Sequence, residues 1–501
     1  MKRSNDHAGY QKALETLKRA HRGMTAADLS AAAALPLPAA REFLSRAADE
    51  FRGRLQVTES SEILYDFPRG FTSRYRSLGA RFGRFMDKFI SLSLTCLAWI
   101  FKVWIGVMLV GYFIIFMLIA LAALTLSMAG GSSNSNSRSR NNSVGGFFLA
   151  SRIFDLIIRL WFYSELTKAM DGSYRKSAPA RRGKPLHKAV FSFVFGEPDP
   201  NGDADTLEKQ ALIAYLGANR GLISLPEYMA ITGLPPQEAE RGILAFCAEF
   251  GGSPEATEEG TIVYRFQDIL LRASTAERET AAADRGKGSQ ALRGPLRRLR
   301  AFSSNNKTMN SWFGIINSVN LLFGGYFFYQ AFNTGIIRTT EQLRASPRIY
   351  AITYDWASSV FSNPQPFILV GLGLIPLLFS FFFWLVPALR LARLDGENQN
   401  IKKRNLRKIG FGKIWEKPRD LVPAAIDSPA PECRPRTLEA EREKLIVEMG
   451  SYSRPDVEAD QTGKTIYSFT ELEREKKALA AGRAAVNPED FKIGKVIFDS
   501  E

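Results

Sequence analysis

The sequence predicts a mainly α-helical membrane protein, with four apolar membrane segments and small α+β modules of winged-helix type on the cytosolic side. Three observations lead to this fold class. Apolar residues are concentrated in two zones of the 501-residue chain, 89–164 and 312–394. A hairpin-like sequence occurs three times outside these zones, as VTESSEILYDF, EATEEGTIVYRF and EADQTGKTIYSF. Basic residues crowd the ends of the apolar zones, as they do beside membrane helices.

Apolar and water-exposed compositions alternate along the chain, and this alternation predicts its organisation. The internal repeats mark the modules, and the apolar runs mark two membrane hairpins. We expect a first winged-helix-like module at 8–68, a basic flank with the first membrane hairpin at 69–166, a linker at 167–206, a second module at 207–273, a basic linker at 274–310, the second membrane hairpin at 311–394, a basic linker at 395–436, a partial third module at 437–484 and a tail at 485–501.

The first two modules are copies of one another. A shift of 199 positions aligns residues 35–67 with 234–266 without a gap. In each copy, Thr25 or Ser224 is a candidate N-cap for a short second helix. A proline then precedes a third helix that ends near Phe51 or Phe250, and two short strands follow around a polar turn. Three helices followed by a hairpin is the winged-helix order. The third copy keeps a helix at 438–449 and the hairpin, and continues into a charged helix near 469–483.

The apolar zones contain four candidate membrane segments: 102–130 with an apolar lead-in from 89, 147–164, 312–332 and 366–394. The first is long enough to cross a hydrocarbon core of about 30 Å. The second carries a charge cluster of Arg152, Asp155 and Arg159, whose spacings of three and four residues allow pairing on one helical face. The alternative is an amphipathic helix in the interface, in which case 89–130 turns back on itself.

Charge predicts the topology. Basic residues are dense at 69–88, 168–188, 285–307 and 390–408, whereas the loops 131–146 and 334–363 contain two and three arginines. The positive-inside rule therefore predicts a multi-pass protein of the inner (cytoplasmic) membrane with both termini cytoplasmic. The same basic flanks account for most of the net charge of +15, and they predict anionic membrane lipid as a partner.

Winged helices commonly read DNA with the third helix, but the charges of this helix argue against DNA as a partner here. In the second module that helix offers Arg241 against several acidic residues, among them Glu238, and an acidic face repels phosphate. We therefore expect contact with a protein partner or self-association. The candidate partner-binding residues are Arg41, Arg46, Glu238, Arg241, Tyr65, Tyr264 and Tyr467. The alternative for the three tyrosines is that they close the small cores.

The residues that would carry catalysis or bind a cofactor form no pattern. The three cysteines and three histidines are scattered, without the spacing of a metal site or an iron–sulfur cluster. A nucleophile with a base, or a pair of catalytic carboxylates, does not emerge from the sequence. We therefore predict that the protein is not an enzyme and has no catalytic residues, cofactor or metal.

The stretch HKAVFSFVFGEPDPNGD at 187–203, with the second module and its GTIVYRF hairpin, resembles a poorly characterised membrane-protein family of bacteria, cyanobacteria and the plastid envelope. Plant members are labelled iron–sulfur cluster biosynthesis family proteins or inner-envelope-associated proteins. The resemblance implies a membrane protein with soluble helical modules and brings no established activity.

These observations predict a membrane-anchored scaffold or adaptor whose repeated modules contact protein at the cytoplasmic face. A membrane-tethered DNA-binding regulator is the first alternative, and it requires a basic reading helix. A small transporter is the second alternative, and it requires a polar cavity between the membrane segments.

Overall fold

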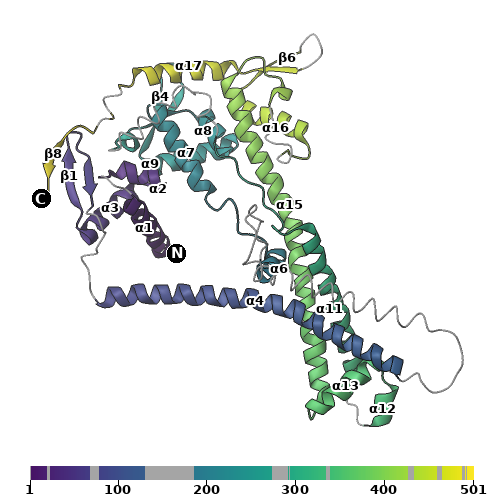
Figure 1. Ribbon diagram of the computed structural model, residues 1–501. Helices are drawn as coiled ribbons and strands as arrows, with labels where there is room; N and C mark the ends of the chain where they lie inside the picture. The colour runs from purple at the N-terminus through teal and green to yellow at the C-terminus, as the bar shows by residue number, and fades with distance from the viewer. Residues whose placement is uncertain are drawn as a thin grey trace, which may run out of the picture. The chain divides into compact units, whose positions relative to one another are not determined.

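The computed structural model of the chain (Figure 1) divides into two compact units. The module unit comprises Met1–Gly83, Asp199–Arg300 and Gly396–Glu501, and the helical unit comprises Arg84–Pro198 and Ala301–Asp395. The structure describes residues 2–19, 23–67, 78–129, 185–272, 292, 294–334, 339–426, 434–459, 465–487, 491 and 493–500.

The first module has three helices and a hairpin. Its elements are α1 (Lys2–Arg19), α2 (Ala26–Ala33), α3 (Leu37–Phe51), β1 (Arg54–Thr58) and β2 (Ile63–Asp66). Thr25 caps α2 in a capping box, because its hydroxyl accepts a hydrogen bond from the Asp28 N–H and the Asp28 carboxylate accepts one from the Thr25 N–H. Pro36 precedes α3, which ends at Phe51 as the sequence predicted.

The second module repeats this arrangement and adds a short strand. Its elements are α7 (Ala204–Ala218), β3 (Leu222–Ile223), α8 (Leu225–Thr232), α9 (Pro236–Phe250), β4 (Gly252–Ala256), β5 (Ile262–Phe266) and the 3-10 turn η1 (Asp268–Leu270). Ser224 and Glu227 form the capping box of α8. The two hairpins have the same register at positions 199 apart, because Leu55 lies opposite Tyr65 and Pro254 lies opposite Tyr264.

The third module has one helix before its hairpin and one after it. Its elements are α16 (Leu438–Gly450), β6 (Asp456–Ala459), β7 (Thr465–Ser468) and α17 (Thr470–Ala485), preceded by the turn η4 (Pro423–Ala425). Val457 lies opposite Tyr467, and Tyr467 also pairs with Leu421. The last strand, β8 (Val496–Asp499), pairs antiparallel with β1 of the first module and completes the sheet β2-β1-β8.

One continuous hydrophobic core runs through all three modules. Its large, fully buried side chains include Leu44 of the first module, Phe250 and Phe266 of the second, and Phe469 of the third. The part of the long helix α15 (Ile375–Glu416) that belongs to the module unit contributes Phe411 to this core. The modules therefore bury each other's apolar faces, and no one of them holds this core alone.

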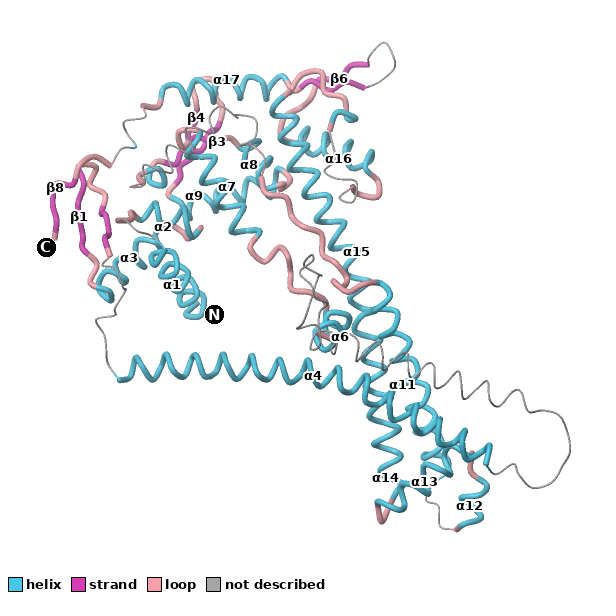
Figure 2. The backbone as a smooth tube through the Cα atoms, viewed as in Figure 1, coloured by secondary structure: helices cyan, strands magenta, loops and turns pink. Residues whose placement is uncertain are grey.

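The helical unit, whose helices are drawn in cyan in Figure 2, contains two smaller hydrophobic cores. Its elements are α4 (Leu78–Ala129), whose first turns belong to the module unit, α6 (Leu186–Phe195), α11 (Lys307–Thr334), α12 (Thr340–Ala345), α13 (Arg348–Val360), α14 (Pro364–Pro366), the π-helical segment η3 (Phe367–Leu374) and the first part of α15. Helix α11 packs closely on η3, because a Cβ atom at Gly373 would lie 2.9 Å from the Phe328 Cα.

The prediction of four membrane segments is wrong. Within the described residues, two helical stretches are long and apolar enough to cross a membrane by length and composition, Leu92–Thr125 and Pro364–Glu416. The expected segment 312–332 does form α11, but its apolar character is diluted by polar residues such as Asn317 and Asn320. The expected segment 147–164 lies outside the described residues, as do its charged residues Arg152, Asp155 and Arg159.

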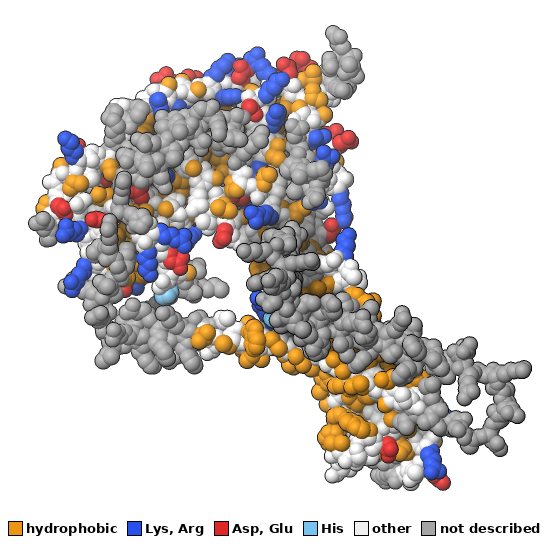
Figure 3. Space-filling model, in the orientation of Figure 1, with side chains coloured by type: hydrophobic (Ala, Val, Ile, Leu, Met, Phe, Trp, Pro, Cys, Tyr) orange, Lys and Arg blue, Asp and Glu red, His pale blue; other side chains and the backbone are white. Residues whose placement is uncertain are grey.

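Helix α4 exposes many large apolar side chains. Among them are Leu94, Leu97, Trp99, Val107 and Leu118. On the face drawn in Figure 3, hydrophobic side chains gather along α4, whereas charged side chains are scattered over the modules. An apolar face of this length that the described residues leave uncovered is typical of a membrane or protein contact.

Candidate functional site

The contact between the first and second modules uses the helix that carries the predicted Arg41. Arg41 Nη2 lies 3.1 Å from Asp268 Oδ2 of η1, and helix α3 packs against α9. Further hydrogen bonds join the modules. Among them, the Thr25 hydroxyl donates to the Leu271 carbonyl at 2.9 Å, and Gln210 Nε2 donates to the Ala32 carbonyl at 2.8 Å. One face of the third helix is therefore used for contact within the protein.

A buried carboxylate, Glu208 of α7, organises a charge centre inside the module unit. Its two oxygens accept from Lys408 Nζ at 2.8 Å, Arg404 Nη2 at 2.9 Å and Arg297 Nε at 3.2 Å. The side chains of Lys408 and Glu208 are only 1% and 8% exposed. Burial lowers the pKa of Lys408, with a further lowering from Arg404 and Arg297, while Glu208 acts in the opposite direction. The centre thus holds three cations around one carboxylate in a largely dry site.

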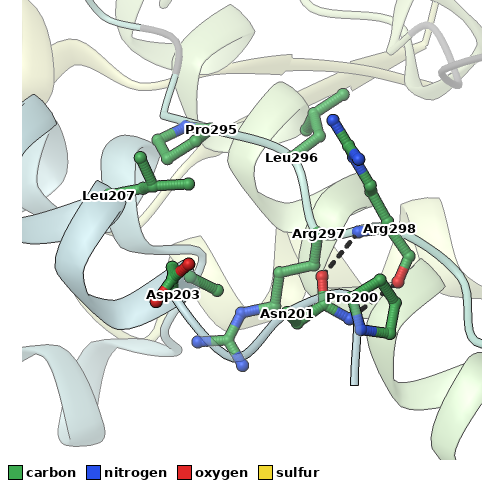
Figure 4. Close-up of a pocket in the computed structure, with 9 residues that line it drawn as sticks. Pro200, Asn201, Asp203, Leu207, Pro295, Leu296, Arg297 and Arg298 are labelled. Carbon is green, nitrogen blue, oxygen red and sulfur yellow. Dashed lines mark hydrogen bonds between the residues drawn. The ribbon is translucent and has the colours of Figure 1, made fainter. Parts of the chain in front are cut away.

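The same region binds an extended segment of the chain, residues 294–300, which we call the strap. Three asparagine side chains each accept from a strap N–H and donate to the carbonyl of the same residue. Asn405 binds Arg297 in this way at 2.9 and 2.8 Å, Asn201 binds Arg298 at 2.8 and 2.7 Å, and Asn398 binds Arg300 at 2.9 Å for both bonds. Figure 4 shows the bonds between Asn201 and Arg298. These clamps bind the backbone of the strap, so its side chains remain available for other contacts.

The strap's arginines meet carboxylates. Arg297 also pairs with Asp205 at 2.8 Å, and Arg300 pairs with Asp199 and, at 2.6 Å, with Glu397. The hydrogen bonds from Arg300 lower the pKa of Asp199. Lys408 donates to the strap carbonyl of Pro295 at 2.6 Å. An extended basic peptide is therefore held by amide clamps and acidic side chains together.

A small cleft of about 240 Å³ lies between the strap and the start of α7 (Figure 4). Its lining includes Pro200, Asp203 and Leu207 on one side and Leu296 and Arg298 on the other. This volume is below the 300–1,000 Å³ of common small-molecule sites. The cleft therefore fits a side chain or a few waters better than a substrate.

The third module is tied to the second through Glu227, which is buried. The Glu227 carboxylate accepts from Arg483 Nη2 of α17 at 2.6 Å and from the Tyr215 hydroxyl at 2.6 Å. Arg220 in turn donates to the carbonyls of Arg483, Ala484 and Val486 at the end of α17. These contacts satisfy the last carbonyls of that helix and fix it on the second module.

The predicted partner-binding residues are not gathered at one place. Tyr65 and Tyr264 are each 7% exposed and belong to the core, as the alternative for these tyrosines stated, and Tyr467 is half-buried. Arg46 lies over the Tyr10 ring, with its Cζ atom 4.4 Å from the ring centroid. Glu238 and Arg241 are exposed on α9.

Sequence reasoning missed Glu208, Lys408 and the asparagine clamps. Glu208 shares a helical face with Leu212 and Leu216, and a carboxylate on an apolar stripe is a signal that could have identified it. Asn398 and Asn405 are seven residues apart and so lie on one face of α15, but only the strap reveals their purpose. Within the described residues, no group of three or more His, Cys, Asp or Glu side chains could hold a metal ion.

Comparison with known proteins gives one informative relative. A chloroplastic protein of Arabidopsis thaliana, described as uncharacterized, is 23% identical over 424 residues, which are 81% of this chain and 73% of the relative. This likeness agrees with the resemblance to a poorly characterised family that has plastid members. No family model matches the chain, and no solved structure is similar to it.

Proposed function

We propose that the protein is a membrane-anchored scaffold whose modules bind polypeptide at one face of the membrane. The observation that carries this proposal is that the module unit binds extended segments of its own chain in two ways. It holds the strap with asparagine clamps, and it adds β8 to the edge of β1. Both ways recognise backbone groups, which every polypeptide offers.

The order of elements in the first two modules is that of winged helices, which supports an adaptor role as well as a DNA-binding one. The contacts favour the adaptor. Arg41 on the third helix of the first module is occupied by Asp268, and exposed Glu238 and Glu240 lie on the third helix of the second module. A helix with this charge repels the DNA backbone.

The exposed apolar face of α4 and the long apolar helix Pro364–Glu416 support the anchor. Basic residues follow the apolar part of α15, among them Arg390, Arg393, Lys402 and Lys403. We place these residues, and the modules with them, at the cytoplasmic face, where they attract anionic lipid. The Arabidopsis relative is described as chloroplastic, and its description names no membrane.

Crosslinking in intact membranes tests the scaffold. A photoreactive amino acid replaces exposed Glu238 on α9, and the matched control carries it at exposed Leu322 on α11. The expected result is that the Glu238 probe captures the members of one protein complex, which the Leu322 probe does not capture. Recovery of DNA, lost at high salt, would instead identify the tethered regulator, and capture of nothing by the Glu238 probe would contradict the scaffold.

A small transporter remains the second candidate because the helical unit has a polar interior. Asn317 donates to the Ser380 carbonyl at 3.0 Å, and Asn320 donates to the Leu109 carbonyl at 2.8 Å. The Asn317 and Asn320 Oδ1 atoms and the Ser380 hydroxyl are buried without a hydrogen-bond partner in the described part of the chain. Such oxygens are suited to water or a polar solute. Solute flux into proteoliposomes that Asn320→Leu abolishes would favour this candidate over the scaffold.

A further inference from the structure

In each of the three hairpins the first strand has an outer edge, and the three edges differ in whether they can accept a further strand. In each of them a tyrosine on the second strand lies opposite a residue of the first strand, in the pairs Leu55/Tyr65, Pro254/Tyr264 and Val457/Tyr467. The backbone N–H and C=O of Tyr65 bond to Met24, and those of Tyr467 bond to Leu421. In the first and third hairpins these groups therefore do not bond to the residue opposite the tyrosine. The N–H and C=O of Leu55 and Val457 consequently point to the outer edge of the hairpin.

At the first hairpin this edge is filled by β8. The Leu55 N–H donates to the Ser500 hydroxyl at 2.9 Å, and the Ser500 N–H donates to the Leu55 carbonyl at 3.0 Å. One residue further along, Gln56 Nε2 donates to Asp499 Oδ2 at 2.9 Å. The edge of the first hairpin is therefore a working acceptor for an extended strand, with a polar side-chain contact that matches the incoming residue.

At the second hairpin the position of Leu55 is taken by Pro254, which has no N–H to donate. The residue beside it, Glu255, is paired with Arg265 of the neighbouring strand at 2.7 Å. Proline on an outer edge is a common protection against strand addition. The second hairpin is thus closed to a partner strand.

At the third hairpin the acceptor position is open. Val457 keeps its N–H, its side chain is 59% exposed, and every residue of β6 is exposed. In the described part of the chain the sheet contains only β6 and β7, so no described strand pairs with the outer edge of β6. An exposed edge with free backbone groups is a template for another strand.

Charge selects the partner for this edge. Glu458 occupies the position of Gln56, and its β6 neighbour Asp456 is also acidic. The position of Arg265, which pairs with Glu255 in the second hairpin, is taken by the neutral Ser468. The aspartate of β8 that matches Gln56 would be repelled by Glu458, whereas a lysine or arginine there would be attracted.

We infer that the outer edge of β6 binds an extended apolar segment of a partner protein that carries a lysine or arginine opposite Glu458. This inference rests on the proposed scaffold and names the chemistry of its partner. The segment adds as an antiparallel strand, with the Val457 N–H and C=O as its central hydrogen-bonding groups. The closed second hairpin and the filled first hairpin leave β6 as the open edge among the three.

A peptide-binding measurement tests the inference on the full chain in detergent. The probe is a fluorescent peptide with the sequence of residues 494–501 and the change Asp499→Lys, and the reference is the unchanged peptide, which stands for a second copy. We expect the cationic peptide to bind about tenfold more tightly than the reference. Val457→Pro should weaken this binding at least about tenfold, because it removes the central N–H. The control Val457→Ala keeps that N–H and should bind normally.

A second variant tests the inference independently, in case Val457→Pro disturbs the folding of the hairpin. Glu458→Lys should reverse the preference, so that the unchanged peptide binds more tightly than the cationic one. Absence of cationic-peptide binding, or binding unaffected by both variants, would overturn the inference. If the unaltered protein bound the unchanged peptide more tightly, the occupant of this edge would be β8 of a second copy of the chain and not a strand of a partner protein. If neither peptide binds while crosslinking at Glu238 recovers a protein complex, the edge of β6 is excluded as the binding site and the proposed scaffold function is retained.

Discussion

At the scale of single residues, three buried glutamates of the module unit have different surroundings. Glu208 and Glu227 lie against cations, whereas the hydrogen bond to Glu475 comes from the Tyr452 hydroxyl, 3.1 Å from each carboxylate oxygen. Burial raises the pKa of Glu475 to about 7 from an ordinary value of 4.5, although the bond from Tyr452 acts in the opposite direction. Glu475 is therefore a residue at which pH acts on this fold near neutrality.

We expect the stability of the module unit to fall as the pH rises from about 4.5 to about 7, because the folded chain keeps a proton on Glu475 that the unfolded chain has lost. The full effect is at most about 3 kcal/mol. Glu475→Gln should remove this decline, raising stability at pH values above 7 and leaving it almost unchanged below 4.5. Urea unfolding on both sides of that interval measures it. The exposed Glu471 supplies the control, and an equal gain from Glu471→Gln would contradict the assignment.

Removal of the Glu208 charge tests the buried centre. Glu208→Gln leaves Lys408, Arg404 and Arg297 together without their central carboxylate. An uncompensated buried charge costs about 3–5 kcal/mol, and the same substitution should therefore destabilise the module unit by that amount. The neighbouring Asp205 is 86% exposed, and Asp205→Asn should cost less than about 1 kcal/mol. Equal losses in urea unfolding would show that burial does not decide the effect.

Some residue roles were predictable from the sequence and others were not. The N-caps Thr25 and Ser224 were predictable because a capping box is a local pattern. The tyrosines were ambiguous between core and surface, since an aromatic residue in a short strand serves either. The pairing of Glu208 with Lys408 spans 200 positions, and a single sequence carries no signal for such a contact.

At the scale of elements, the strap has no regular secondary structure, yet the backbone N–H and C=O groups of three of its residues are hydrogen-bonded, as they would be in a strand. Its backbone groups at Arg297, Arg298 and Arg300 are satisfied by asparagine side chains instead of a neighbouring strand. A segment bonded in this way can remain extended inside a helical surrounding without leaving buried backbone groups unpaired.

Asn405→Asp should remove one of the two hydrogen bonds that join this side chain to Arg297 of the strap. The carboxylate can still accept from the Arg297 N–H, but it cannot donate to the Arg297 carbonyl. We expect a loss of about 1–2 kcal/mol, since one buried carbonyl loses its donor, together with faster amide exchange over 294–300. Hydrogen exchange with mass spectrometry measures the local effect. The clamp would be contradicted if Asn405→Ala, which removes both bonds, gave no faster exchange than Asn405→Asp.

Element boundaries with local causes were predictable, and those with distant causes were not. Pro36 and Pro235 set the starts of α3 and α9, so these helices could be anticipated. Strand β8 could not, because its residues have no neighbouring strand in sequence and pair with β1 near the other end of the chain. The long helix α15 was expected to end near 394, whereas it continues to Glu416.

At the scale of the whole molecule, α4 exposes large apolar side chains that a membrane would cover. Val107 lies near the middle of the stretch Leu92–Thr125 and is exposed, and Leu94 lies near its start and is also exposed. An arginine at the centre of a membrane helix costs about 2.5–3.5 kcal/mol by insertion scales. Near the helix end, the side chain reaches the interface and the cost is small.

Val107→Arg should therefore reduce the fraction of chain that stays in the membrane pellet after alkaline carbonate extraction, and Leu94→Arg should not. Extraction of the unaltered chain by carbonate would show that α4 does not cross the bilayer. Equal behaviour of the two variants would show that α4 is not the segment that holds the chain in the membrane.

The number of membrane segments was the part of the architecture that composition misjudged. A run such as 312–332 has the length of a membrane helix, but Asn317 and Asn320 lie inside it and are buried, each bonded to a neighbouring helix. These asparagines lower the mean hydropathy of the run, and a prediction made mainly from the length of the run overlooks them.

The pairing of β8 with β1 also has a consequence for biosynthesis. Gln56 and Asp499 are 443 positions apart, so the first sheet is completed by residues that leave the ribosome long after β1 itself. At about 5–20 residues per second, the edge of β1 waits roughly 20–90 s for its partner strand. During translation the nascent chain thus has an unfilled edge, which a chaperone has to shield or a neighbouring nascent chain can occupy.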